Sequence, residues 1–226
     1  MKRPEPLGIF GGTFDPVHIA HLRLAEEAAE ALGLAGVRWI PAGQPKHREA
    51  PQVTPAHRLR MVEMAVAGNP RFSVDSAEVD SGDASYTVPT LERLRRELGG
   101  DRPLVLLLGA DAFAGLPTWH RWQALFDLAH LGIAHRPGFV LDEAALPAGL
   151  AHEVAARRCA DPGRLGDSPA GRICTFAMTP LAVSATQIRA LLADGRSPRY
   201  LLTPAVIDYI GLHHLYRNPT SPADGS

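Results

Sequence analysis

Cysteine and aromatic residues are scarce in this chain of 226 residues, and neither positive nor negative charge is in clear excess. Its two cysteines, Cys159 and Cys174, are not in Cys-x-x-Cys spacing, so neither a disulfide scaffold nor a cysteine-rich zinc site is expected. Lysine and arginine total 23 and aspartate and glutamate total 24, which gives a net charge of -1 with no block of like charge. Nucleic acid and an anionic membrane are therefore not the expected partners.

Long hydrophobic runs are also missing. The longest, residues 104–108, ends at Gly109, whereas a membrane-spanning helix needs roughly 20 apolar residues. A secretory signal is not expected either, because Pro6, Gly11 and Gly12 interrupt the apolar residues near the amino terminus. We therefore expect a soluble protein of the cytoplasm.

The composition is sufficient for one sizeable core. Hydrophobic residues make up 46% of the chain, and this length is typical of one domain or of one domain with a small subdomain. We expect a single domain over residues 1–216 and a polar, mobile tail over residues 217–226. The sequence leaves open whether copies of the chain form a homo-oligomer.

Strand-like and helix-like segments alternate along the chain. Short apolar runs predict strands at residues 7–10, 37–40, 72–74, 104–108, 131–134 and 173–176. Apolar residues at helical spacing, with capping signals, predict helices at residues 22–32, 54–66, 87–98, 143–158, 184–192 and 203–211. The alternation indicates an α/β fold: a Rossmann-like, doubly wound, mostly parallel sheet with helices on both faces.

A glycine loop joins the first strand to the first helix in residues 8–21, Gly-Ile-Phe-Gly-Gly-Thr-Phe-Asp-Pro-Val-His-Ile-Ala-His. Gly11 and Gly12 are expected to adopt positive φ and to let a ligand approach closely, so that unpaired N–H groups face an anion. His18 and His21 are three residues apart and project from one side of the first helical turn. A glycine pair or a His-x-x-His pair alone is more often structural. Together, and in this register, they predict a polyphosphate site.

Other candidate residues follow the second and fourth predicted strands, where the ligands of an open α/β sheet collect. Lys46 lies in the loop after residues 37–40, although a lysine in a loop is more often simply solvated. Ser85-Tyr86-Thr87 precedes a predicted helix, where an N-cap is the simpler interpretation. Asp111, after the strand at 104–108, could equally cap the next helix.

Three later features have similar alternatives. Trp119 would be a core residue on its sequence context alone, and Arg136 an exposed charge. Ser184 and Gln187 have the spacing of a capping box at the start of a helix. Arg189 lies one turn into that helix, where it can reach back to an anion at the helix end.

The segment Gly11-Gly12-Thr13-Phe14-Asp15-Pro16-x-His18-x-x-His21 resembles the signature of the nucleotidyltransferase superfamily with a HIGH-like motif. Within that superfamily the chain resembles the bacterial nicotinate-nucleotide adenylyltransferases. The resemblance runs from about Leu7 to Tyr216 through six ordered motifs. Two residues depart from the family pattern: Ala20 stands where glycine is usual, and Ala185 where serine is usual.

The resemblance implies a set of residues for ATP and a set for the second substrate. The residues implied to bind ATP are Gly11, Gly12, Thr13, Phe14, His18, His21, Gly109, Asp111, Ser184, Thr186 and Arg189. The residues implied to bind nicotinate mononucleotide are Lys46, Tyr86, Thr87, Trp119, His120 and Arg136. Catalysis is assigned to His18, His21, Lys46 and Arg189. Because the loop order here is Gln44-Pro45-Lys46-His47, the lysine role could belong to Lys46 alone or be shared with Arg48.

The implied reaction is adenylyl transfer from ATP to nicotinate mononucleotide, which yields nicotinic acid adenine dinucleotide and pyrophosphate in NAD biosynthesis. Mg²⁺ is expected to be bound mainly through the ATP phosphates, with no dedicated protein ligands. Two alternatives stay open. One is a related adenylyltransferase for nicotinamide mononucleotide or phosphopantetheine, and the other is a non-catalytic module that senses an adenine nucleotide.

Overall fold

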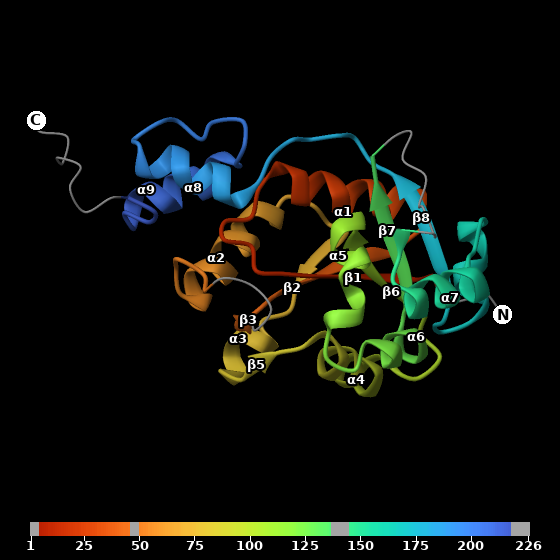
Figure 1. The fold of residues 1–226 in the computed structure, drawn as a ribbon. Coiled ribbons are helices and arrows are strands. Elements are labelled where there is room, and N and C mark those ends of the chain that lie inside the picture. The colour runs from red at the N-terminus through yellow and green to blue at the C-terminus, as the bar shows by residue number, and fades with distance from the viewer. Residues whose placement is uncertain (1–4, 46–49, 137–144, 218–226) are drawn as a thin grey trace, which may run out of the picture.

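The computed structural model describes residues 5–45, 50–136 and 145–217. Its centre is a six-stranded sheet in the order β4-β2-β1-β6-β7-β8, with every neighbouring pair parallel (Figure 1). The strands are β1 (Leu7–Gly12), β2 (Gly36–Pro41), β4 (Phe72–Val74), β6 (Leu104–Gly109), β7 (His130–His135) and β8 (Ile173–Ala177). This is the doubly wound arrangement expected from the sequence.

The strand order reverses between β1 and β6. The chain first builds outward from β1 through β2 and β4, and then returns to the other side of β1. The ladder between β1 and β6 ends at the pair Ile9 and Leu106, although β1 continues to Gly12 and β6 to Gly109. The carboxyl ends of these two strands are therefore not paired with each other. This is the place where open α/β sheets bind ligands.

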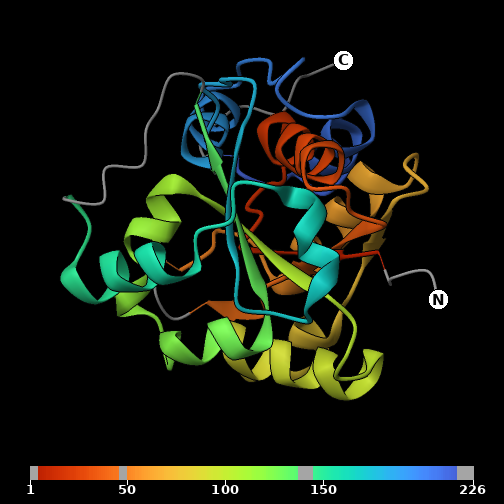
Figure 2. The same ribbon diagram turned by 90° about the vertical axis from the view of Figure 1, so that its right-hand side faces the viewer.

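Helices cover both faces of the sheet, with α1 and α4 on opposite sides (Figures 1 and 2). The helices α8 and α9 lie at one end of the molecule (Figure 1). The helices described are α1 (Ile19–Ala31), α2 (Pro55–Val66), α3 (Ala77–Ser81), α4 (Thr87–Leu98), α5 (Ala110–Ala114), α6 (Leu125–Leu128), α7 (Ala148–Arg157), α8 (Ala185–Ala193) and α9 (Pro204–Leu212). Among the described residues, no helix combines the length and the apolar character needed to cross a bilayer.

Each face of the sheet has its own hydrophobic core. Phe10 and Leu107 pack on the face that α1 covers, in a cluster with Trp39. Their neighbours Ile9 and Leu106 point to the other face and pack with residues of α4 and α6. Because side chains alternate along a strand, a parallel sheet covered on both faces has strands that are apolar at every position.

All six predicted strands are confirmed, most of them one or two residues longer than expected. The predicted helices are present, but the one expected at 143–158 begins at Ala148, and residues 143 and 144 lie outside the described part of the chain. In α2, Leu59 is only half-buried, whereas Arg58 and Met61 are buried. Of the predicted tail, only Arg217 belongs to the described residues.

Candidate active site

The glycine loop after β1 is shaped by Phe14. The prediction that Gly11 and Gly12 adopt positive φ is wrong, because both lie at the end of β1 and the positive φ, 51°, falls on Phe14. A Cβ added to Gly12 would lie 2.8 Å from the Phe14 ring, whereas one added to Gly11 would meet only the Ile40 carbonyl oxygen, at 4.0 Å. Close packing against Phe14 therefore requires glycine at position 12, whereas Gly11 leaves room for a ligand.

Phe14 holds this unfavourable backbone conformation because its ring is enclosed. The ring lies 5.5 Å from that of Phe10, 5.4 Å from that of Trp39 and 5.1 Å from that of His21, measured between centroids. A non-glycine residue with positive φ costs on the order of 1–3 kcal/mol, and burial of the aromatic ring offsets that cost. Ring packing consequently holds the loop in this conformation at the point where it enters the first helix.

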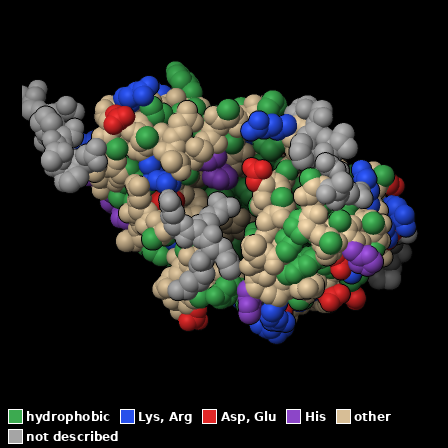
Figure 3. Space-filling view, in the orientation of Figure 1, with side chains coloured by type: hydrophobic (Ala, Val, Ile, Leu, Met, Phe, Trp, Pro, Cys, Tyr) green, Lys and Arg blue, Asp and Glu red, His purple; other side chains and the backbone are tan. Residues whose placement is uncertain are grey.

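His18 and His21 form a stacked pair at the start of α1. Their ring centroids are 3.7 Å apart and the ring planes are inclined by 23°. The His18 backbone N–H donates to Nδ1 of His21 at 3.2 Å, so a neutral His21 carries its proton on Nε2. In the space-filling view, histidine side chains lie beside a hollow in the middle of the face (Figure 3).

His18 is neutral at physiological pH. Its side chain is only 6% exposed, and burial lowers the pKa of the imidazole from 6.5 to about 4. Its Nδ1 is completely covered by protein, and the His18 side chain faces the His21 backbone N–H in a reciprocal capping box. Nε2 is therefore the ring nitrogen that is left to contact a ligand.

Asp15 connects this loop to three distant segments. Its carboxylate, 5% exposed, accepts the Tyr216 hydroxyl at 2.7 Å and the Gln52 backbone N–H at 2.8 Å. The Arg189 guanidinium donates to the Asp15 carbonyl oxygen at 2.9 Å and lies 3.8 Å from its carboxylate. Arg189 also donates to the Thr186 hydroxyl at 3.4 Å. The start of α8 is thereby held beside the glycine loop.

The start of α8 has the predicted cap. Ser184 is the N-cap, and its hydroxyl accepts the Gln187 backbone N–H at 3.2 Å. A surface cavity of about 420 Å³ lies next to this segment, lined by Thr186, Arg189 and Tyr216 among others. The structure thus brings Ser184, Thr186 and Arg189 to one helix start next to an open cavity.

Arg58 joins the ends of β1 and β2. It is fully buried, and its guanidinium donates to the carbonyl oxygens of Thr13 at 2.7 Å, Ala42 at 2.6 Å and Gly43 at 2.8 Å. Burial lowers the pKa of the guanidinium, and the nearby Asp15 carboxylate opposes that shift. Sequence interpretation missed this residue, although it is a charged side chain at four-residue spacing from the buried Val62 on an apolar helix face.

The predicted mononucleotide segments also meet. The short strands β3 (Gln44–Pro45) and β5 (Ala84–Ser85) form a separate parallel pair, which places the loop before Lys46 beside the segment that leads into α4. The Tyr86 ring, at the N-cap of α4, lies 5.0 Å from that of His120. Lys46 and Arg48 themselves lie outside the described residues.

The segment around Trp119 is attached to α4 as well. Arg121 forms an ion pair with Glu92 of α4 at 2.8 Å, and Trp119 is half-buried against the core on the α4 side of the sheet. One part of the Trp119 side chain is therefore packed and another part reaches the surface. Tyr86, Thr87, Trp119 and His120 belong to one local assembly around the start of α4.

Three other candidates lie at the carboxyl ends of neighbouring strands. Gly109 ends β6 and is the N-cap of α5. Asp111 is exposed in the first turn of that helix, and Arg136 is exposed directly after β7. These residues share the carboxyl edge of the sheet with the glycine loop.

The residues described do not include a group of three or more histidine, cysteine, aspartate or glutamate side chains arranged to hold a metal ion. The oxygens of Asp15 are already occupied by Tyr216 and Gln52, whereas the carboxylate of Asp111 is exposed. This donor set fits a divalent cation whose ligands are mainly phosphate and water.

The chain is similar to known proteins over nearly its whole length. A family model described as cytidylyltransferase-like matches residues 9–191. A "Probable nicotinate-nucleotide adenylyltransferase" of Dechloromonas aromatica is 64% identical over 214 residues, which are 95% of this chain and 99% of the relative. A protein of the same name from Pseudomonas aeruginosa is 53% identical over 213 residues, with 94% and 98% covered.

Solved structures of low sequence identity share the fold. A Plasmodium falciparum nicotinic acid mononucleotide adenylyltransferase complexed with NaAD superposes with a TM-score of 0.69 at 17% identity, covering 94% of this chain and 97% of that one. The same enzyme complexed with APC gives a TM-score of 0.68 at 18% identity, with the same coverage. The fold class expected from the sequence is thereby confirmed.

Proposed function

The chain belongs to the nicotinate-nucleotide adenylyltransferases of the cytidylyltransferase-like family, and we propose that its site joins the adenylyl group of ATP to nicotinate mononucleotide and releases pyrophosphate. A phosphate oxygen of the mononucleotide attacks the α-phosphorus of ATP. The bond from that phosphorus to the oxygen bridging to the β-phosphorus breaks, and pyrophosphate takes the electron pair. The attacking phosphate is largely ionised at neutral pH, so catalysis needs alignment and charge stabilisation rather than a general base.

The stacked histidine pair is the observation that carries this proposal. Because the backbone N–H of His18 donates to Nδ1 of His21, the neutral His21 ring has its proton on Nε2, where it can be donated to a phosphate oxygen. His18 is neutral as well, and because its side chain faces the His21 backbone N–H in the capping box, its proton also lies on Nε2. Two neutral donors can stabilise charge that develops on the α-phosphate and on the departing pyrophosphate without binding the ground state too tightly.

The remaining phosphate contacts come from residues on either side of the strand-order reversal. The room beside Gly11 suits a phosphate close to the backbone of Gly12 and Thr13. Arg189 and Lys46 would neutralise the β- and γ-phosphates, and the helix start at Ser184 and Thr186 would donate to the same group. Phe14 would shape this pocket, and Gly109 and Asp111 would face the adenosine.

Mg²⁺ would be held by the ATP phosphates and water, and when bound it would neutralise charge on the leaving pyrophosphate. The exposed Asp111 is a candidate for a contact with the ion through water.

The mononucleotide would bind at the start of α4. The backbone N–H groups of Thr87 and His120 would hold the pyridine carboxylate, Trp119 would stack on the ring, and Tyr86 would close the pocket beside His120. Arg136 and Lys46 are proposed contacts of the phosphate end. An amide in place of the carboxylate would set one donor against another, which costs about 1–3 kcal/mol, or roughly 10- to 100-fold in kcat/KM.

Pyrophosphate release tests the proposal directly. The purified protein is supplied with ATP, Mg²⁺ and one of three acceptors: nicotinate mononucleotide, nicotinamide mononucleotide or phosphopantetheine. We expect turnover with the acid nucleotide, 10- to 100-fold less with the amide and none with phosphopantetheine. Binding of adenine nucleotides without pyrophosphate release would overturn the catalytic proposal in favour of a sensing module. The two free, buried cysteines support a cytoplasmic site of action.

A further inference from the structure

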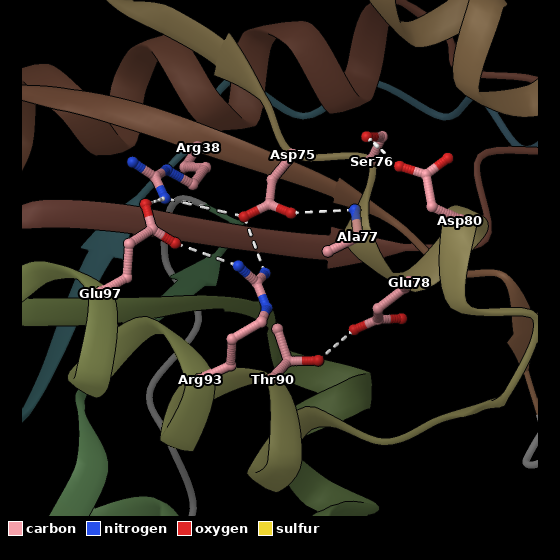
Figure 4. A network of polar contacts seen from close by, with 9 residues as sticks. All are labelled: Arg38, Asp75, Ser76, Ala77, Glu78, Asp80, Thr90, Arg93 and Glu97. Atoms are coloured by element: carbon pink, nitrogen blue, oxygen red, sulfur yellow. Dashed lines mark hydrogen bonds and ion pairs between the residues drawn. The ribbon is translucent and has the colours of Figure 1, made fainter.

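Glu78 of α3 lies next to the segments that are proposed to bind the mononucleotide. Its carboxylate accepts the Thr90 hydroxyl of α4 at 2.5 Å (Figure 4). Burial raises the pKa of this carboxylate, and hydrogen bonding to Thr90 and to the Ser85 side chain of β5 opposes that shift. Thr90 is buried, and its backbone N–H donates to the Tyr86 carbonyl oxygen at 3.3 Å. One carboxylate therefore contacts both the strand before the start of α4 and the first turns of that helix.

The hydrogen-bond capacity of Ser85 fixes the direction of its bond to Glu78. The Ser85 oxygen accepts the backbone N–H groups of Gly43 at 2.8 Å and Gln44 at 3.3 Å. A hydroxyl has two acceptor positions and one proton. Because both acceptor positions are occupied, the Ser85 hydroxyl can interact with the Glu78 carboxylate only as a donor.

The loop at residues 43–45 packs closely against α3, the helix that carries Glu78. A Cβ added to Gly43 would lie 2.1 Å from the Glu78 carbonyl oxygen, so the two backbones are in contact. The Gln44 side chain donates to the Gly82 carbonyl oxygen at 2.7 Å, just after α3 ends. Helix α3 and Ser85 consequently determine where the chain enters the loop that contains Lys46.

We propose that Glu78 is a positioning residue for the mononucleotide, acting through Ser85 and Thr90 on the loop at residues 43–45 and on the start of α4. The inference rests on the proposed function, because it assigns these two segments to the second substrate. Glu78 does not touch the substrate in this scheme. It supplies the acceptor that keeps the Ser85 hydroxyl oriented toward the backbone of Gly43 and Gln44.

The helix α3 itself is anchored independently. Asp75 accepts the Ala77 backbone N–H at 3.1 Å and forms ion pairs with Arg93 at 2.8 Å and Arg38 at 3.7 Å (Figure 4). Removing the Glu78 carboxylate therefore leaves the helix in place. The effect of a substitution at Glu78 should be local, which makes it suitable as a test.

The test measures KM for each substrate in Glu78→Leu, Glu78→Gln and Ser85→Ala. Glu78→Leu and Ser85→Ala should raise KM for nicotinate mononucleotide about tenfold, which corresponds to about 1.4 kcal/mol, because each variant loses a charge-assisted hydrogen bond. Both variants should leave KM for ATP within twofold. Glu78→Gln keeps one acceptor for Ser85 and should recover most of the loss. The increase in KM for nicotinate mononucleotide in the double variant Glu78→Leu/Ser85→Ala should be smaller than the product of the two single increases, because residues of one network do not contribute additively.

Asp80→Asn is the matched control. Asp80 lies on the same helix, is exposed and accepts the Ser76 hydroxyl at 2.6 Å (Figure 4). Both of its KM values should match the wild type. Equal changes in both KM values for Glu78→Leu, or none, would overturn the positioning role.

Amide hydrogen exchange separates this inference from the proposed function. Without any substrate, the Gly43 and Gln44 amides should exchange at least tenfold faster in Glu78→Leu and Ser85→Ala than in the wild type and in Asp80→Asn. If that acceleration is absent, the inference fails even for an active enzyme. If the wild type shows no adenylyl transfer to nicotinate mononucleotide, the proposed function fails whatever the exchange rates are.

Discussion

Replacement of Arg58 by methionine is expected to lower the free energy of unfolding by about 3–5 kcal/mol. The side chain is fully buried and donates three hydrogen bonds to the carbonyl oxygens of Thr13, Ala42 and Gly43. Each buried acceptor left without a donor costs about 1–3 kcal/mol. Methionine avoids the cost of burying a guanidinium, and that gain offsets part of the loss.

Arg58→Lys separates charge from geometry. An ammonium on a shorter stem can reach one or two of the three carbonyl groups but cannot reproduce the planar fork, so we expect a loss of about 2 kcal/mol. Urea unfolding with an unchanged m-value measures both losses. The exposed Arg60, paired with Glu63 at 3.0 Å on the same helix, provides the control, and Arg60→Met should stay within about 0.5 kcal/mol.

The reasoning is refuted if Arg58→Met costs less than about 1 kcal/mol, a cost no larger than that of an ordinary substitution. Because the three carbonyl groups belong to the glycine loop and to the loop after β2, KM should rise for both substrates. An increase confined to ATP would show that the loop after β2 is held by other contacts.

Three further outcomes are expected. His21→Ala should lower kcat by on the order of 100-fold with little change in KM for ATP, because its ring acts on developing charge; steady-state turnover near the wild-type rate would remove its catalytic role. The depressed pKa of His18, about 4, means that the unfolded chain binds a proton before the native state does. The contribution of neutral His18 to the free energy of unfolding is therefore complete above about pH 6.5 and declines by about 3 kcal/mol as the pH falls toward 4. Denaturation of the wild type and His18→Gln at pH 7 and 4.5 should show that the variant lacks this decline. An equal decline in both proteins would contradict the prediction. Trp119→Ala should raise KM for the mononucleotide and not for ATP, which separate titration of the two substrates in the pyrophosphate assay measures; equal changes would place Trp119 outside the mononucleotide pocket.

The sequence could predict those features that depend on neighbouring residues. The strand β6 and the cap at Ser184 follow from a short apolar run and from a serine three residues before the amide that it accepts. The position of positive φ could not be predicted, because it depends on the packing of Phe14 among rings from two strands and a helix. Arg58 was missed for a related reason: its partners are backbone carbonyl groups, which leave no pattern in the sequence.

The contacts of Asp15 indicate that the proposed phosphate-binding site forms completely only when nearly the whole chain has folded. Its carboxylate accepts hydrogen bonds from Gln52, 37 residues away, and from Tyr216, 201 residues away, and its carbonyl oxygen accepts one from Arg189, 174 residues away. Contacts between residues so distant in sequence form only after the intervening chain has been ordered, because the entropy of loop closure must be overcome first. The stacked histidines, by contrast, are linked by a bond between residues three apart. The groups proposed to stabilise the reacting phosphate can therefore be arranged early and locally, whereas Arg189 reaches its place only when the carboxyl-terminal segment has folded back onto the glycine loop.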